Sequence, residues 1–173
     1  MICLINKAMK KISTPIDDQT ISKLNTGDMV LLSGYIYTAR DAAHKRMFDC
    51  LCANAAPPFD YAGQVVFYAG PCPTPPGKII GSIGPTTSGR MDAYSPALIH
   101  AGLKVMIGKG ERSIAVKEAI RERGGLYLAA VGGVAALMSQ CVAKAELIAY
   151  DDLGTEAVRK LTVKELPLIV AYK

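Results

Sequence analysis

The sequence predicts an α/β fold: a single domain with a mixed, largely parallel sheet and short flanking helices. Apolar runs of strand length alternate with segments whose apolar residues recur at helical spacing, which is the pattern of βα units. The 16 glycines and 10 prolines are spread along the chain and separate these segments. A length of 173 residues suits one compact domain, so we expect residues 1–173 to form a single unit.

Local signals predict each element of the first half. An acidic start at Asp17 with apolar Ile21 and Leu24 predicts a helix. After the second strand, four prolines within eight residues exclude regular structure. In order, we expect a helix over 17–24, a strand over 29–37, a helix over 40–52, a strand over 64–69 and a loop over 70–77.

The second half continues the alternation. We expect Ser113 to cap the amino end of a helix and Gly124 with Gly125 to end it, because these residues satisfy the free backbone groups of helix ends. In order, we expect a strand over 78–83, a helix over 91–101, a strand over 104–108, a helix over 114–123, a strand over 126–130, a helix over 134–140, a strand over 142–150, a helix over 155–161 and a strand over 167–172.

Composition and charge exclude several functions. The net charge is +5, but the chain has no arginine-rich tail and no aromatic spacing of an RNA-binding motif, so we expect no nucleic-acid partner. The longest apolar run, 126–138, contains two glycines and falls short of the ~20 residues that span a bilayer. At the amino terminus, apolar residues precede the lysines, the reverse of a secretory signal. We therefore expect no membrane association and a cytoplasmic location.

The five cysteines do not have the spacing of a metal site. An odd number in a chain of this length favours reduced thiols, and no C-x2-C pair is present. Cys50 and Cys52 are close in sequence, but side chains two residues apart on a helix diverge. We expect no metal ligands from this chain alone; the cysteines are Cys3, Cys50, Cys52, Cys72 and Cys141.

Two segments repeat one arrangement: a strand, a glycine turn carrying a cation, and a helix amino end. They are 84–90 and 108–110. Free backbone N–H groups and the helix dipole make such a turn a site for an anion, and two of them suit an anion with two ends. Arg90 adds a planar fork for a carboxylate or phosphate, and Lys109 adds a point charge. The segment 84–90 also carries the hydroxyls of Thr86, Thr87 and Ser88. In the alternative interpretation, these hydroxyls only cap a helix and the glycines only turn the chain.

A nucleotide-binding P-loop is disfavoured. Gly84 and Gly89 have the G-x4-G spacing, but Arg90 and Met91 stand where that motif needs lysine and then serine or threonine for magnesium.

Three motifs together resemble the carboxy-terminal domain, or separate β subunit, of the iron-sulfur hydro-lyases that comprise class I fumarase and L-tartrate dehydratase. The motifs are Tyr37-Thr-Ala-Arg-Asp-Ala-Ala-His-Lys45, Gly84-Pro-Thr-Thr-Ser-Gly-Arg-Met-Asp92 and Gly108-Lys-Gly-Glu-Arg-Ser113. The resemblance implies a swivelling β/β/α domain. It also implies a [4Fe-4S] cluster held by three cysteines of an α partner and not by this chain, a small dicarboxylate substrate, and a dimer of αβ heterodimers.

The resemblance also implies roles for individual residues. It places Arg40, Arg90 and Lys109 on the substrate carboxylates, with Thr87 and Gly110 beside them, and makes Thr86 the proposed base. A threonine hydroxyl is a poor base unless its neighbours lower its pKa.

Three further residues are expected near this site. His44 relays a proton or orients Arg40, or is a hydrogen-bonded structural histidine. Asp41 is expected to pair with Arg40 or His44. Asp92 is expected to cap its helix and hold Arg90 in place.

The motifs favour fumarate, which is hydrated to (S)-malate, as the substrate. The segments 87–92 and 109–113 look closer to fumarase than to tartrate dehydratase, although Glu111 stands where fumarases more usually have asparagine. A β subunit of L-tartrate dehydratase or of a related 2-hydroxy diacid dehydratase therefore stays open. So does a non-catalytic anion-binding module.

Overall fold

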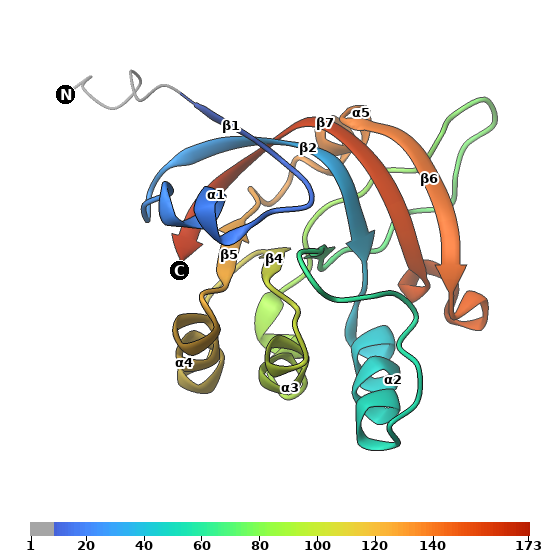
Figure 1. The fold of residues 1–173 in the computed structure, drawn as a ribbon. Helices are drawn as coiled ribbons and strands as arrows, with labels where there is room; N and C mark the ends of the chain where they lie inside the picture. Colours follow the sequence, from blue (N-terminus) through green and yellow to red (C-terminus); the bar gives the residue numbers. More distant parts are fainter. Residues whose placement is uncertain (1–8) are drawn as a thin grey trace.

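The computed structural model describes residues 9–173 and has an α/β fold with a mixed seven-stranded sheet. The strand order is β1-β2-β3-β4-β5-β7-β6, and β2 also pairs with β7, so that β2, β3, β4, β5 and β7 close into a barrel-like ring (Figure 1). The strands are β1 Lys10–Ser13, β2 Met29–Thr38, β3 Val65–Phe67, β4 Val105–Gly108, β5 Leu126–Ala129, β6 Val142–Ala149 and β7 Val158–Tyr172.

The first five strands are parallel, and β7 runs antiparallel to β2, β5 and β6. The expected α/β class with a mixed sheet is thus confirmed. Because β2 to β5 run in one direction, their carboxyl ends meet at one edge of the sheet. In open parallel sheets, that edge is the usual place for ligands.

Two apolar cores lie on the two faces of the strands. Along β3, Val65 and Phe67 belong to one buried cluster, whereas Val66 belongs to the other. The first cluster draws on all five ring strands and so fills the inside of the ring. The second joins the outer face to α2, α3 and α4, which lie side by side in Figure 1. Burial on both faces explains the continuous apolar runs of β3 to β5.

The helices begin and end largely where local signals predict. Ser113 caps α4, since its side chain accepts a hydrogen bond from the Val116 amide, and Gly124 ends the helix in the left-handed conformation at φ 61°. The helices are α1 Asp18–Ser22, α2 Asp41–Cys52, α3 Ser95–His100, α4 Ile114–Arg123 and α5 Ala135–Gln140, with 3₁₀ helices η1 Ser88–Met91 and η2 Asp151–Glu156.

Two expected elements are wrong, one helix is shorter than expected, and one strand was not expected. The segment 78–83 is not a strand; a side chain at Gly81 would meet the Cys72 carbonyl at 2.2 Å, so the proline-rich loop packs directly against it. The helix expected over 91–101 is confirmed for 95–100 as α3, but residues 92–94 form a turn between η1 and α3. The helix expected over 155–161 is wrong because those residues end η2 and begin β7, whose side chains alternate into the ring. Strand β1 carries no strong apolar pattern.

Within residues 9–173, no helix has the length and apolar character needed to cross a membrane. Cys3 lies outside the described residues.

Candidate functional site

The three motifs meet at the carboxyl edge of the parallel strands. Arg40 follows β2 as the N-cap of α2, and Lys109 directly follows β4. The Thr86 amide donates to the carbonyl of Tyr68, which follows β3, at 2.7 Å. The Lys109 amide in turn donates to the Thr86 carbonyl at 3.4 Å, and Thr87 forms a bridge with Lys109. Backbone pairing therefore fixes the second motif against the third.

An ion pair fixes the second motif against the first. Arg90 Nη2 contacts Asp41 Oδ2, which joins η1 to the amino end of α2. The expectation that Asp41 pairs with Arg40 or His44 is thus corrected. The reason is position: Asp41 is the first residue of α2, and Arg90 approaches that helix end from the neighbouring turn.

Arg40 has an acidic partner that the motifs do not include. Its Nη2 lies 3.2 Å from Glu156 Oε1, and the other oxygen of Glu156 accepts a hydrogen bond of 2.9 Å from the Ala42 amide. Among the described residues, Arg40 Nε is buried without a hydrogen-bond partner. Segment 152–158 shares in the family resemblance, but the sequence assigned Glu156 no role and no partner.

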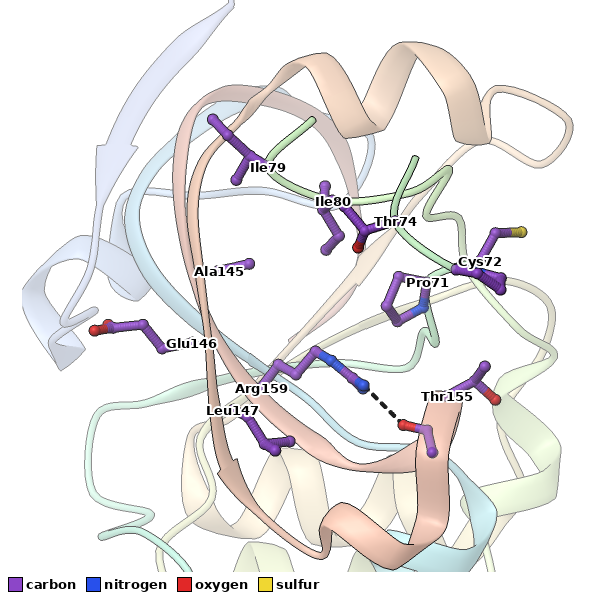
Figure 2. A pocket seen from close by; sticks show the side chains of 12 residues that line it. Pro71, Cys72, Thr74, Ile79, Ile80, Ala145, Glu146, Leu147, Thr155 and Arg159 are labelled. Carbon is purple, nitrogen blue, oxygen red and sulfur yellow. Dashed lines mark hydrogen bonds between the residues drawn. The ribbon is translucent and has the colours of Figure 1, made fainter. Parts of the chain in front are cut away.

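A cavity of about 340 Å³ is lined by Gly154 and Thr155, the two residues that precede Glu156 in the chain (Figure 2). The proline-rich loop forms one wall, and β6, the start of β7 and Thr155 form the other. Arg159 crosses its floor and donates to the Gly154 carbonyl at 2.8 Å. None of the predicted site residues lines this cavity, so we place the candidate site at the sheet edge.

His44 is completely buried beneath the site. Its Nδ1 lies 2.9 Å from the Arg40 carbonyl, and its ring packs edge-on against Tyr68 at 4.9 Å. Burial lowers the pKa of His44 from 6.5 to about 4, so the ring is neutral at pH 7. A carbonyl only accepts, so Nδ1 carries the proton. Nε2 is then a proton acceptor without a partner among the described residues.

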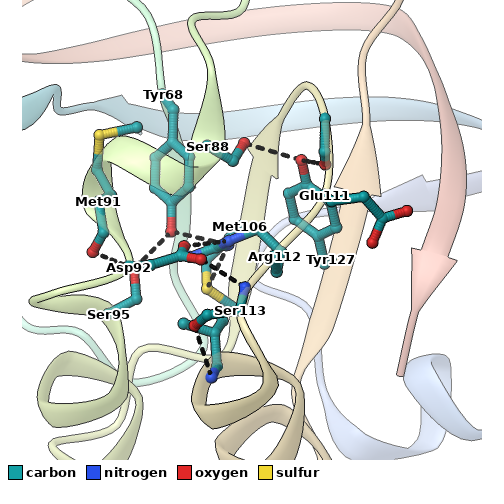
Figure 3. Close-up of polar contacts among 12 residues, drawn as sticks. Tyr68, Ser88, Met91, Asp92, Ser95, Met106, Glu111, Arg112, Ser113 and Tyr127 are labelled. Carbon is teal, nitrogen blue, oxygen red and sulfur yellow. Dashed lines mark hydrogen bonds and ion pairs between the residues drawn. The ribbon is translucent and has the colours of Figure 1, made fainter.

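Asp92 holds Arg112 and not Arg90, which corrects the expectation for this residue. Arg112 Nε donates to Asp92 Oδ1 at 2.7 Å, and the Ser113 amide donates to Oδ2 at 2.5 Å (Figure 3). The Asp92 carboxylate therefore already binds the Ser113 amide in the second predicted anion site.

Sequence reasoning missed Arg112, the most buried cation of this region. Its guanidinium donates to Ser95 Oγ at 2.8 Å and lies between two tyrosine rings, 5.2 Å from the centre of Tyr68 and 5.1 Å from that of Tyr127. It lies in the third motif, between Glu111 and Ser113, but the sequence assigned it no role of its own. The partners that bury it come from β5, α3 and the segment after β3, and no local pattern indicates them.

Ser88 and Gly110 are linked through Tyr127. The buried Ser88 hydroxyl lies 2.8 Å from the Tyr127 hydroxyl, which donates to the Gly110 carbonyl at 3.0 Å. Gly108 permits this contact, because a side chain there would come within 2.0 Å of Ser88 Oγ. The Ser88 side chain thus links the turn at 84–90 to the turn at 108–110 and does not cap a helix.

Three cations project from the resulting surface. Lys109 and Arg90 are exposed, and Arg40 is partly buried. Thr87 and Gly110 are also exposed, whereas Thr86 is partly buried. The surface combines fixed positive charge with hydroxyl groups, a combination suited to carboxylates.

The described cysteines do not fit an iron-sulfur cluster. Cys50, Cys52, Cys72 and Cys141 are free thiols, and residues 9–173 contain no group of three or more Cys, His, Asp or Glu that could hold a metal ion.

The fold and this surface define an α/β domain with a cationic site at the carboxyl edge of parallel strands. The chain belongs to the fumarase C-terminus family, whose model matches residues 6–173. It is 36% identical over 96% of its length to the anaerobic class I fumarate hydratase of Escherichia coli, and 39% identical over 94% to the mitochondrial fumarate hydratase 1 of Leishmania major. It covers only 30% of each of these two relatives.

A shorter relative matches over most of its own length. The chain is 38% identical over 87% of its length to a protein of Methanocaldococcus jannaschii named as a candidate L(+)-tartrate dehydratase subunit beta, and covers 80% of it. The relatives thus include fumarate hydratases of which the chain covers less than a third and a shorter protein named as a candidate subunit beta.

Proposed function

We propose that this chain is the β-type half of a hydro-lyase that interconverts fumarate and (S)-malate. The observation that carries the proposal is the convergence of Arg40, Arg90 and Lys109, from three separate motifs, at one edge of the sheet. The family and its fumarate hydratase members support it. Residues 1–173 are proposed as one hydro-lyase domain, which swivels relative to its partner as the family resemblance implies.

The proposed work of the three cations is to bind a dicarboxylate and stabilise its reaction. Removing the carbon-bound proton of malate transfers negative charge onto the adjacent carboxylate. A cation fixed beside that carboxylate stabilises the transition state more than the ground state. Arg90 suits this task because its guanidinium can donate two parallel hydrogen bonds, and Lys109 adds charge from the adjoining turn. Thr87 and Gly110 line the same turns.

Proton transfer is proposed to involve Thr86 and His44. Thr86 needs an acceptor for its own proton if it is to act as a base. His44 is neutral at pH 7 and has an unpartnered Nε2 below the site. Tyr68 connects them, since its ring contacts His44 and its carbonyl binds the Thr86 amide. We propose that His44 serves as the acceptor or orients this segment.

We propose that a [4Fe-4S] cluster belongs to a separate α partner. When bound there, such a cluster supplies a Lewis acid for departure of the malate hydroxyl. A dimer of αβ heterodimers is the proposed assembly, which light scattering of the purified complex would test.

We propose fumarate rather than tartrate as the substrate, because segments 87–92 and 109–113 resemble those of fumarase more than those of tartrate dehydratase. The Methanocaldococcus jannaschii relative is named for tartrate, so tartrate is the alternative substrate. The third alternative is a non-catalytic module, whose cationic surface would bind an anion without converting it.

Reconstitution tests these alternatives. The chain is purified with and without a cluster-bearing partner encoded beside it, iron and sulfide are restored anaerobically, and loss of fumarate absorbance is followed, with L-tartrate in parallel. We expect fumarate turnover only from the two chains together. Faster turnover of tartrate would select the alternative substrate, and activity of this chain alone would contradict the proposed division of labour.

A further inference from the structure

The carboxylate of Glu156 bridges two groups at the amino end of α2. One oxygen lies 3.2 Å from Arg40 Nη2, and the other accepts the Ala42 amide at 2.9 Å. Only 23% of the Arg40 side chain and 22% of the Glu156 side chain are exposed. A carboxylate is favourable at a helix amino end, where it meets free N–H groups and the positive end of the helix dipole.

Neighbouring groups fix the segment that carries Glu156. Arg159 donates to the Gly154 carbonyl, two residues before Glu156, at 2.8 Å (Figure 2). It also donates to the carbonyl of Ala157, the residue after Glu156, at 3.3 Å. The loop after β3 packs on the same segment. A side chain at Gly70 would come within 2.5 Å of the Thr155 carbonyl and 3.1 Å of Arg40 Cδ. Glu156 is therefore held in place by contacts on both sides.

The contact with Glu156 leaves part of the Arg40 guanidinium without a protein partner. A guanidinium has five N–H donors in one plane. Glu156 contacts one terminal nitrogen, while Nε is buried and has no partner among the described residues. The Glu156 carboxylate thus restrains the guanidinium through Nη2 and leaves other N–H donors of Arg40 unused.

We infer that Glu156 is a positioning residue for Arg40. It orients the guanidinium so that the unused donors face a carboxylate of the substrate. This inference rests on the proposed function for the substrate contact, but the restraint of Arg40 by Glu156 is a property of the chain itself. The opposite role would be a plug, in which Glu156 occupies the place of a substrate carboxylate and must leave. The two roles predict opposite changes in KM.

Kinetics of three variants in the reconstituted complex separate the roles. In Glu156→Ala, we expect KM for fumarate to rise roughly tenfold with kcat little changed, because Arg40 binds the carboxylate similarly in the ground and transition states. Glu156→Gln keeps an acceptor for the Ala42 amide and is expected to restore part of the affinity. Asp152→Ala is the matched control, since Asp152 lies in the same segment η2 and pairs with Arg46 at the surface. A lower KM in Glu156→Ala would identify a plug, and an unchanged KM would also overturn the inference.

A second measurement does not depend on catalysis. In the full chain labelled with ¹⁵N-arginine, the Nε–H signal of Arg40 is assigned by its loss in Arg40→Lys. We expect this buried group to exchange slowly with solvent in the wild type and in Asp152→Ala, and at least tenfold faster in Glu156→Ala. Equal exchange in all three would overturn the inference. If the wild-type complex turned over neither fumarate nor tartrate, the proposed function would fail while this measurement still tested the restraint of Arg40.

Discussion

Asp41 and Arg90 form an ion pair across two motifs that lie almost fifty positions apart in the sequence. The pair joins the first residue of α2 to the η1 turn. Together with the contact between Arg40 and Glu156, it gives both predicted substrate arginines a carboxylate partner from the same chain. Each arginine is thereby oriented before any ligand arrives, which reduces the entropy lost on binding.

The planar fork of Arg90 is expected to matter more than its charge. Arg90→Lys keeps the charge but cannot donate two parallel hydrogen bonds, so we expect kcat/KM for fumarate to fall about 10- to 100-fold in the reconstituted complex. Arg46→Lys is the control, because Arg46 pairs with Asp152 outside the site. An unchanged kcat/KM in Arg90→Lys would remove this residue from the substrate site.

His44 is expected to make stability depend on pH between about 4 and 6.5. Burial lowers the pKa of His44 to about 4, so the unfolded chain binds a proton in this range and the folded chain does not. Its contribution is complete above pH 6.5 and is lost as the pH falls toward 4. At pH 5 the loss should reach about 2 kcal/mol.

Urea unfolding at pH 7 and pH 5 measures this loss. His44→Gln retains an N–H donor for the Arg40 carbonyl but does not titrate, so we expect its free energy of unfolding to change less between the two pH values. The same change in both proteins would show that other groups carry the pH dependence.

Arg112 is expected to be essential for folding stability. In Arg112→Met, the Asp92 carboxylate loses its buried partner, and we expect a loss of about 3–5 kcal/mol in the free energy of unfolding. Adding Asp92→Asn removes the unpaired charge and should recover part of the loss. Arg123→Met is the control, because Arg123 bonds the His100 carbonyl at the exposed surface. A loss below 1 kcal/mol in Arg112→Met, by urea unfolding, contradicts the structural role.

Two glycines of the site segments should respond differently to alanine. A side chain at Gly108 would overlap Ser88 Oγ and approach the Tyr68 ring at 2.9 Å, so we expect Gly108→Ala to lose about 1–3 kcal/mol of stability. At Gly89 the nearest atom is the Glu111 carbonyl oxygen at 3.9 Å, an ordinary contact. Gly89→Ala should therefore unfold like the wild type. Similar unfolding curves for both variants would refute the close approach at Gly108.

Elements with local signals were predictable from the sequence. Ser113 and Gly124 mark the ends of α4 because a cap satisfies backbone groups within a few residues. The ring closure was not predictable. It depends on β7 pairing with β2, and the partners Met29 and Ile169 lie 140 positions apart. The helix expected over 155–161 failed for the same reason, since pairing partners distant in sequence decided its conformation.

The motifs also predicted residues that the fold brings to one edge, but not the contacts among them. Arg112 and Glu156 were missed because their partners lie on other elements. Asp92 was assigned to Arg90, two residues earlier, whereas its partner Arg112 lies twenty residues away. Short-range spacing could not distinguish these alternatives, because both arginines are adjacent to glycine turns.

We propose that this chain supplies the carboxylate-binding cations and that its α partner holds the cluster. The most direct test is the Arg40→Ala/Arg90→Ala double variant in the reconstituted complex, with iron content and cluster absorbance measured beside fumarate turnover. We predict an intact cluster and a loss of kcat/KM of about 10²- to 10⁴-fold, since each of the two charged contacts is worth ~1.5–3 kcal/mol. Turnover at the wild-type rate with an intact cluster would contradict the account.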